Sequence, residues 1–198
     1  MKTNLKFPII ITLIVIIGGT IPVFAQGESK TEAFFKIFSS GNYHMKAKIT
    51  EGGKETTFET FVKGDQMAST MAMEGESVRV IQKDKKIYMI MDSMKMVMVT
   101  AVNSASEVKS VKANGMKYTG SGTAVFNKKS LPYDEYSSSN GEKLRIFIDG
   151  ANLAGIRNLI PGQTTADLVI LALDQNIPNN TFTIPSGYQV QDMSSFGQ

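Results

Sequence analysis

The stretch that most constrains the fold runs from Ile87 to Val99 and reads IYMIMDSMKMVMV. Methionine stands at positions 89 and 91 before Asp92-Ser93, and at positions 94, 96 and 98 after it. Side chains two residues apart on a strand share a face, so this spacing predicts two antiparallel strands joined by a tight turn. A two-residue loop would place Met91 opposite Met94, whereas a four-residue loop would place it opposite Met96. Either loop keeps nearly all of these thioethers on one face of a sheet.

This methionine face has three interpretations. Methionine is long, unbranched and easily repacked, which favours a deformable apolar wall for a lipid-like ligand. The first alternative is an ordinary sandwich core in which methionine fills gaps. The second is a Cu(I) site made of clustered thioethers. Against the copper site, residues on one face of a single strand are spaced by ~7 Å, whereas a metal needs its ligands to converge.

Residues 1–25 have the pattern of a secretory signal peptide. Lys2 and Lys6 form a positively charged n-region, an apolar core follows at 7–17, and Val23-Phe24-Ala25 is a small-residue cleavage site. The apolar run is shorter than the ~20 residues that a spanning helix needs, which favours cleavage over a retained anchor. No later segment is long and apolar enough to cross a membrane. We therefore expect an exported protein of the periplasm or cell envelope, with residues 26–198 forming a single domain.

Composition excludes several classes of protein. The chain has no cysteine, which rules out disulfides, thiolate metal sites, cysteine nucleophiles and a lipid-modified cysteine. The formal net charge of +3 includes the two lysines of the predicted signal peptide, so the rest of the chain is close to neutral. Because no basic run is present, we expect no nucleic-acid partner.

The sequence offers no catalytic constellation. Its single histidine, His44, falls on the polar face of the first predicted strand, and we expect a solvated side chain there. No acid–histidine–nucleophile set can be assembled without it. We therefore predict that the protein is not an enzyme and needs no cofactor or metal.

An amphipathic helix is predicted at 29–40. Ser29-Lys30-Thr31-Glu32 matches a capping box, and Gly41 is a typical helix end. The apolar positions give the helix a strongly aromatic face: Phe34, Phe35, Ile37 and Phe38. This face either caps the core or closes one mouth of a cavity, and the sequence does not separate the two.

Residues 42–99 predict a meander of six antiparallel strands. The turn Gly64-Asp65 pairs Val62 with Met67 and Phe58 with Met71. A turn at Gly75-Glu76 would place Val78 and Val80 opposite Met73 and Met71. The meander thus has one continuous apolar side, and we expect the opposite side to be mostly polar and wet.

A second capping box predicts a brief helix at 104–114, after which the meander resumes. Five more strands are predicted, at 116–127, 131–138, 142–149, 151–159 and 165–174. The total is about eleven strands with no parallel connection. The tail 175–198 is expected to be irregular coil with one short strand near Tyr188. Arg157 is expected at the surface, with orientation of a lipid head group as the alternative.

The layout resembles one known family. A signal peptide, an amphipathic first helix, a long meander with an inserted helix and the tail FTIPSGY (182–188) together look like the periplasmic lipoprotein-carrier superfamily, which is LolA/LolB-like. The segments FVKGDQM (61–67) and KDKKIYM (83–89) also resemble exported members of unassigned function.

The resemblance implies a mainly β fold with a helical lid. It is an incomplete antiparallel β-barrel of about eleven strands, wrapped around an apolar cavity and accompanied by two or three short helices. The implied cavity wall is Phe58, Val62, Met67, Met71, Met73, Val80, Met89, Met91, Met96 and Met98. The implied lid is Phe34, Phe35, Ile37 and Phe38.

The implied function is that of a soluble carrier or chaperone, which holds the acyl chains of lipids or lipoproteins in the Met-rich cavity. Its partner would be a lipid or a lipidated protein, and we expect a monomer. The alternative is an envelope sensor or regulatory domain on the same fold, which binds lipid and an envelope protein partner.

Overall fold

The computed structural model describes residues 31–51, 54–73, 76–101, 116–162 and 165–193. These residues form helix α2 (Glu32–Ser39) and strands β1 (Asn42–Glu51), β2 (Lys54–Lys63), β3 (Gln66–Met73), β4 (Glu76–Lys83), β5 (Lys86–Met91), β6 (Met96–Ala101), β7 (Lys117–Phe126), β8 (Lys129–Ser137), β9 (Lys143–Asp149), β10 (Asn152–Leu159), β11 (Ala166–Asp174) and β12 (Gln189–Asp192). The predicted signal peptide, residues 1–25, and the predicted helix at 104–114 lie outside the described residues. Among the described residues no helix has the length and apolar character that crossing a membrane would require.

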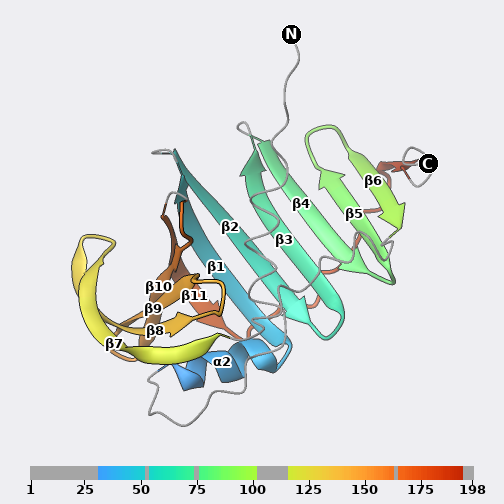
Figure 1. Ribbon diagram of the computed structural model, residues 1–198. Coiled ribbons are helices and arrows are strands. Elements are labelled where there is room, and N and C mark those ends of the chain that lie inside the picture. Colours follow the sequence, from blue (N-terminus) through green and yellow to red (C-terminus); the bar gives the residue numbers. More distant parts are fainter. Residues whose placement is uncertain (1–30, 52–53, 74–75, 102–115, 163–164, 194–198) are drawn as a thin grey trace.

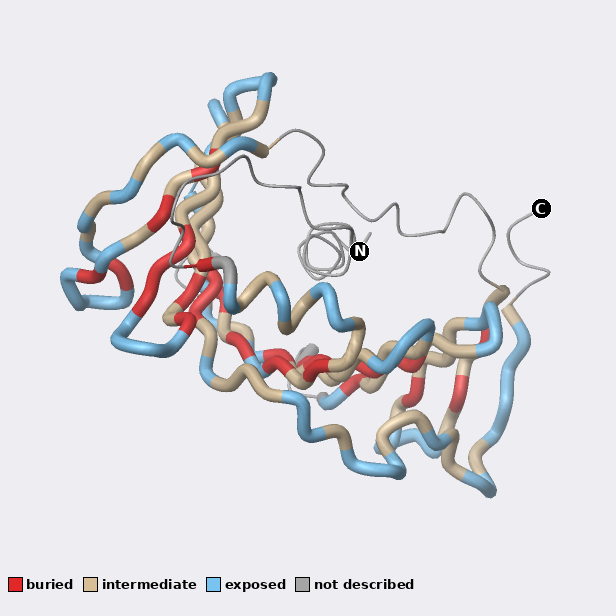
Figure 2. Tube along the Cα trace, turned by 90° about the horizontal axis from the view of Figure 1, so that it is seen from below, coloured by how far each residue is buried: buried red, intermediate tan, exposed pale blue. Residues whose placement is uncertain are grey.

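The described strands form one open, twelve-stranded sheet in the order β12-β6-β5-β4-β3-β2-β1-β11-β10-β9-β8-β7. In Figures 1 and 2, β1–β6 make one broad layer, from which β7–β10 turn away. The predicted open, mainly β architecture is confirmed. The eleven predicted meander strands and the predicted short strand near Tyr188 are present, but that last strand, β12, pairs in parallel with β6, which was not predicted. That pairing joins segments far apart in the sequence, which hairpin signals do not report.

Across the hairpins of β2–β6, the residues predicted to share a face of the sheet do share it. Val62 pairs with Met67 and Phe58 with Met71, as predicted. The Met hairpin has the four-residue loop, with Met91 opposite Met96 and Met89 opposite Met98.

One predicted register is wrong. Met71 pairs with Val78, and Met73 pairs with Glu76, so the β3–β4 connection is residues 74–75. The error is a shift of two residues, which leaves every side chain on the face predicted for it. The apolar pattern therefore could not distinguish the two registers.

Helix α2 packs on one side of the sheet, which we call the inner face. Its Phe38 ring meets Tyr43 of β1 edge to face, with ring centroids 5.2 Å apart. Gly41 has a φ of 61°, and its N–H donates to the carbonyl of Phe38, so the helix ends where predicted. The start differs from the prediction: the helix begins at Glu32, with Thr31 as the N-cap residue in place of Ser29.

The opposite side, the outer face, is not the wet surface that was predicted. Ile81, Ile90 and Val97 of β4–β6 are 0% exposed on this face. The C-terminal tail covers them, since Phe182, Ile184 and Tyr188 pack against this cluster. The strand part of the tail was predicted near Tyr188, but the packing of the tail across the sheet was not.

The outer face of β9–β11 is covered by the tip of the β7–β8 hairpin. The tip turns through Asn127 and Lys128, both with positive φ, and its Phe126 stacks on Phe147 of β9 at a centroid distance of 4.4 Å. Adjacent strands lie ~4.8 Å apart, so a flat sheet would hold β7 too far from β10 for contact. Phe126 nevertheless lies against Gly155 of β10, which shows that the hairpin curls back over the sheet.

Candidate functional site: an apolar inner face

The sheet register carries apolar side chains across the inner face from strand to strand. One row joins Phe58, Met71, Val78, Met91 and Met96 on β2 to β6. A second row ends in Val80, Met89 and Met98, and Val62 pairs with Met67 in a third. The strand register therefore places all ten predicted wall residues on one face. For Met73 this placement rests on the backbone register alone.

Burial along this face falls from β2 towards β6. Phe58 is 3% and Met71 is 9% exposed, and both belong to the core cluster around Tyr43 and Met45 of β1. Val62 and Met67 pack partly buried against the same cluster. The methionines of β5 and β6 are only half-buried. The end of the face nearest β6 is thus apolar and partly open.

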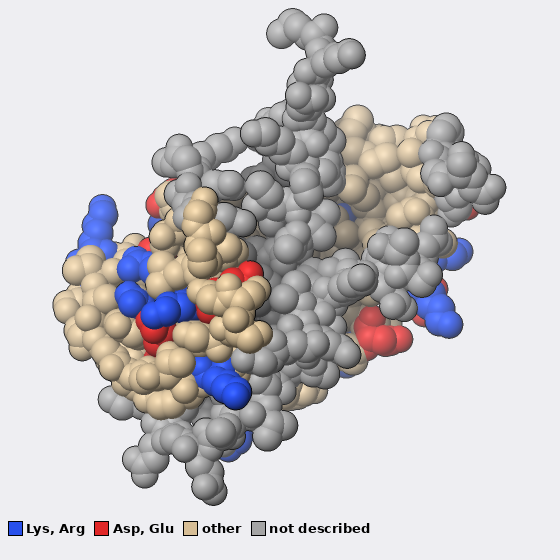
Figure 3. Space-filling view, in the orientation of Figure 1, with Lys and Arg blue, Asp and Glu red and all other residues tan. Residues whose placement is uncertain are grey.

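Figure 3 shows how charge is distributed on the side seen in Figure 1. Lys, Arg, Asp and Glu side chains gather over the β7–β9 part of the molecule, whereas the described surface over β5 and β6 in this view is mostly neither blue nor red.

A pair of hydroxyls interrupts the apolar rows, and sequence reasoning missed it. Thr60 and Ser69 are 1% and 3% exposed and face each other on β2 and β3. Their hydroxyl oxygens lie 3.1 Å apart in a hydrogen bond. Because each hydroxyl has a partner, the pair is tolerated within an apolar surface.

The predicted lid residues lie against the other half of the inner face. Phe34 and Phe35 pack on the cluster of Tyr136, Ile146 and Leu153, from β8–β10. Ile37 packs on the β1–β2 cluster, and Phe38 contacts both clusters. The helix therefore caps core residues at the junction of the two halves of the sheet. Whether these side chains also close over a ligand remains a prediction.

A buried polar network holds the start of α2 on the sheet. The Thr31 hydroxyl lies 2.5 Å from the hydroxyl of Tyr136 and donates to Oδ2 of Asp134 at 3.3 Å. Ser121 of β7 donates to the other oxygen of Asp134 at 2.6 Å. Thr31 is the N-cap residue, yet its side chain makes no capping hydrogen bond and is used for this anchor. Sequence reasoning missed the network, since an Asp inside a strand gives no signal of burial.

His44 is not the solvated side chain that was predicted. Its Nε2 lies 2.7 Å from Oε1 of Glu59, its Nδ1 lies 3.2 Å from Oδ2 of Asp174, and its ring stacks on Phe61. The histidine side chain is only 15% exposed. β1 lies between β2 and β11, so the two carboxylates approach the ring from the two neighbouring strands. The group lies on the outer face and therefore does not belong to the apolar site.

Arg157 also lies on the outer face and does not orient a head group at the inner face. Its Nε and Nη2 each donate to the carboxylate of Asp167 at 2.7 Å. Its guanidinium lies 5.3 Å from the ring centre of Phe147. The hydrogen bonds that Arg157 donates to Asp167 raise the pKa of Arg157 more than burial lowers it.

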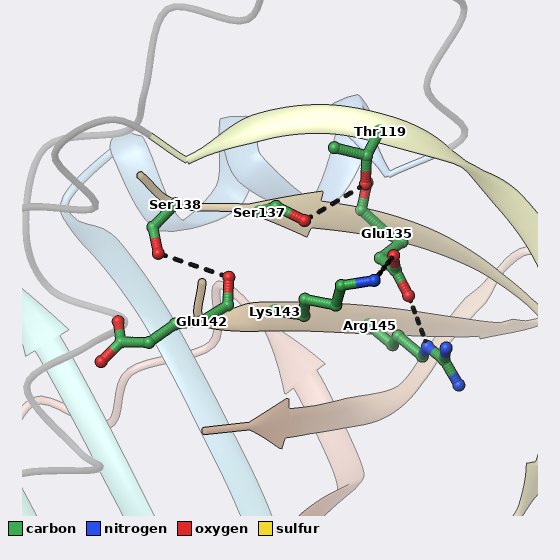
Figure 4. Close-up of polar contacts among 7 residues, drawn as sticks. All are labelled: Thr119, Glu135, Ser137, Ser138, Glu142, Lys143 and Arg145. Carbon is green, nitrogen blue, oxygen red and sulfur yellow. Dashed lines mark hydrogen bonds and ion pairs between the residues drawn. The ribbon is translucent and has the colours of Figure 1, made fainter. Parts of the chain in front are cut away.

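A charged cluster on β8 and β9 shows the same structural use of ion pairs (Figure 4). Arg145 Nε and Lys143 Nζ donate to the two carboxylate oxygens of Glu135 at 2.8 and 3.0 Å. Burial acts to raise the pKa of Glu135, but the hydrogen bonds from Arg145 and Lys143 outweigh it and lower that pKa. Among the described residues, no three His, Asp or Glu side chains are grouped to hold a metal ion.

Comparison with known proteins identifies similar structures and no similar sequences. No protein-family model matches the chain, and no curated protein matches it. An uncharacterized conserved protein from Thermus thermophilus has a similar fold, with a TM-score of 0.51 and 9% identity over 81% of this chain and 99% of that one.

Two further matches are weaker. The LolA superfamily protein NE2245 from Nitrosomonas europaea matches with a TM-score of 0.40 and 9% identity, over 80% of this chain and 99% of that one. MucB, in a complex with MucA(peri), matches with a TM-score of 0.46 and 11% identity over 82% of this chain, which spans 60% of MucB. Solved structures similar to this chain thus include a LolA superfamily protein. At these identities the similarity concerns the fold alone.

Proposed function

We propose that the protein is an exported, non-catalytic binding protein that holds acyl chains of lipids or lipidated proteins against its inner face. The observation that carries the proposal is the apolar surface across β2–β6, which is buried at the end nearest the core and half-buried at the methionines of β5 and β6.

The energetics of acyl burial are sufficient for such a role. Burying a methylene contributes ~0.8 kcal/mol, so a chain of ~14 methylenes gains about 11 kcal/mol before ordering costs. Part of this gain is lost to the entropy of association, which leaves an affinity that is micromolar or better. No polar anchor is required to reach it.

Methionine suits this surface better than branched residues do. A Met side chain has several accessible rotamers, so one wall can accept acyl chains of different length and shape. The ladder of Met91 opposite Met96 and Met89 opposite Met98 places four such side chains side by side where the face is half-exposed.

Displacement of a fluorescent fatty acid, with native mass spectrometry of co-purified lipid, tests the proposal. The double variant Met71→Lys and Met96→Lys places two charges on the apolar face, and we expect it to abolish uptake. Val125→Lys is the matched control, because Val125 is 65% exposed at the tip of the β7–β8 hairpin. Uptake that survives in the double variant, while circular dichroism shows a folded protein, would overturn the proposal.

A pull-down from envelope extract then separates a carrier from a sensor. A carrier would retain many lipidated proteins, whereas a sensor would retain one dominant partner. The double variant should lose lipidated clients in the first case, because their acyl chains are the bound groups.

A further inference from the structure

Four thioethers form a square on the inner face at the β5–β6 hairpin. Met91 lies directly opposite Met96, and Met89 lies directly opposite Met98. All four side chains are half-buried. The sequence left the loop length open: a two-residue loop would have paired Met91 with Met94 and Met89 with Met96, and the four-residue loop selects Met89, Met91, Met96 and Met98 instead.

The dimensions of the square allow the sulfurs to converge. Directly opposed residues have Cβ atoms ~4.5–5.5 Å apart. Residues two apart on one strand are separated by ~7 Å. The half-diagonal of such a rectangle is ~4 Å, so four side chains that lean towards its centre bring their sulfurs closer together. The ~7 Å spacing along a single strand argues against a metal site made by that strand alone. Here each strand supplies two of the four ligands, and the opposed pairs lie closer together.

The chemistry of the four ligands selects one class of ion. Thioethers are soft, neutral ligands, and they favour Cu(I) over Zn²⁺, Mg²⁺ or Ca²⁺, which prefer harder ligands. Met side chains carry no proton to lose, so binding would not depend on the titration of a ligand. The four side chains are half-buried, so each keeps some contact with solvent.

The other methionines of the described strands do not offer this arrangement. Met45 and Met71 are 1% and 9% exposed within the core cluster, and Met67 lies opposite Val62 and Gln82. Met94 is 55% exposed in the loop between β5 and β6. Only the square combines four thioethers on two adjacent rungs of one strand pair within the described residues.

We propose that Met89, Met91, Met96 and Met98 form a binding site for a single Cu(I) ion. The four side chains belong to the surface that would hold acyl chains, but the copper site does not depend on that proposed function. Binding as Cu(I) requires no electron transfer by the protein.

An anaerobic competition titration tests this proposal with Cu(I) itself as the probe and a chromogenic Cu(I) chelator as competitor. We expect the purified protein to withdraw one equivalent of Cu(I) from the chelator. X-ray absorption should show a first shell of sulfur alone. Each single Met→Leu change in the square should weaken binding by about tenfold or more, and the quadruple change should abolish it.

Leucine is the informative substitution, because it keeps the apolar volume and removes the sulfur. Because the titration contains no lipid, its result separates failure of the copper site from failure of the lipid proposal. Met94→Leu and Met67→Leu are the controls, and they should leave the Cu(I) affinity unchanged. The copper site is refuted if the wild-type protein withdraws no Cu(I), if the quadruple variant still does, or if the control changes weaken binding equally.

Discussion

The hydroxyl of Tyr188 donates a hydrogen bond of 2.9 Å to Oδ1 of Asp92 and so joins the C-terminal tail to the loop between β5 and β6. Directly after it, the N–H of Gln189 donates to the carbonyl of Lys95. Further back along the tail, Lys83 Nζ donates to the carbonyl of Phe182 at 2.9 Å. The tail is therefore held on both sides of the residues that cover the outer face.

Removing an apolar contact of the tail should destabilise the whole sheet. Ile184 packs against a cluster that includes Ile81 and Ile90. We expect Ile184→Ala to lower the free energy of unfolding by about 1–3 kcal/mol, measured by urea denaturation, because it leaves these buried side chains without their cover. Val190→Ala, at a site that is 64% exposed, should change it by less than ~0.5 kcal/mol. Equal effects of the two changes would show that the tail does not contribute to the core.

The His44–Glu59 contact should be measurable as a coupling energy. Hydrogen bonds to a charged partner contribute ~1.5–3 kcal/mol, and this one is mostly shielded from solvent on the histidine side. A double-mutant cycle with His44→Ala and Glu59→Ala should give a coupling of about 1 kcal/mol or more. The more exposed pair of Lys48 and Glu55 is the control cycle, with an expected coupling of ~0–1 kcal/mol. A His44 coupling no larger than that of the control would contradict the geometry.

Stability should fall at high pH because of Tyr43. Burial raises the pKa of Tyr43 to about 12, from an ordinary value of 10.0. A raised pKa means that the folded state favours the protonated phenol, so the contribution is complete below pH 10 and is lost as the pH rises from 10 towards 12. The loss for this one group is about 3 kcal/mol.

Tyr43→Phe removes the titrating hydroxyl and tests this assignment. Urea denaturation at pH 9 and pH 11.5 should show a smaller decrease for the variant than for the wild-type protein. Tyr118→Phe, at a partly exposed site on β7, is the comparison. If Tyr43→Phe decreases as steeply as wild type, another group is responsible for the alkaline loss.

Gly155 should not tolerate a side chain. A Cβ at this position would lie 2.3 Å from the carbonyl oxygen of Leu168 and 2.3 Å from Cζ of Phe126. The carbonyl belongs to the neighbouring strand and cannot move without breaking the sheet, so Gly155→Ala should cost about 2–3 kcal/mol or more. Gly64→Ala meets no neighbour and suffers only from its φ of +61°, which costs about 1–2 kcal/mol. A smaller cost at Gly155 than at Gly64 would mean that β10 and β11 can separate at this point.

The alternation of residues predicted the inner face correctly because strand side chains repeat every two residues. Even the wrong β3–β4 register kept Met71 and Val78 on that face, since the error was an even number of residues. The same two-residue alternation also indicated that the outer face of these strands is covered, and the prediction of a wet outer face did not use it. Tyr88, Ile90 and Val97 alternate with the methionines, and such a nearly continuous apolar run is typical of a strand covered on both faces.

Contacts between distant segments could not be read from local pattern. His44 looked solvated because it shares its strand face with Lys46 and Lys48, yet its partners Glu59 and Asp174 come from β2 and β11. Asp134 looked like an ordinary strand residue, and its burial follows from the docking of Thr31 at the start of α2.

The sequence by itself determined which residues form strands and which side chains share a face, because both follow from the backbone geometry of a few adjacent residues. The tertiary structure alone decided what covers each face: α2 on the inner side, the tail and a curled hairpin on the outer side. It also decided which four methionines face one another on β5 and β6, since the length of one loop fixes the partner of every residue in the two strands. These outcomes depend on packing between segments that can lie more than a hundred residues apart, as Thr31 and Tyr136 do, and a local sequence pattern does not predict such contacts.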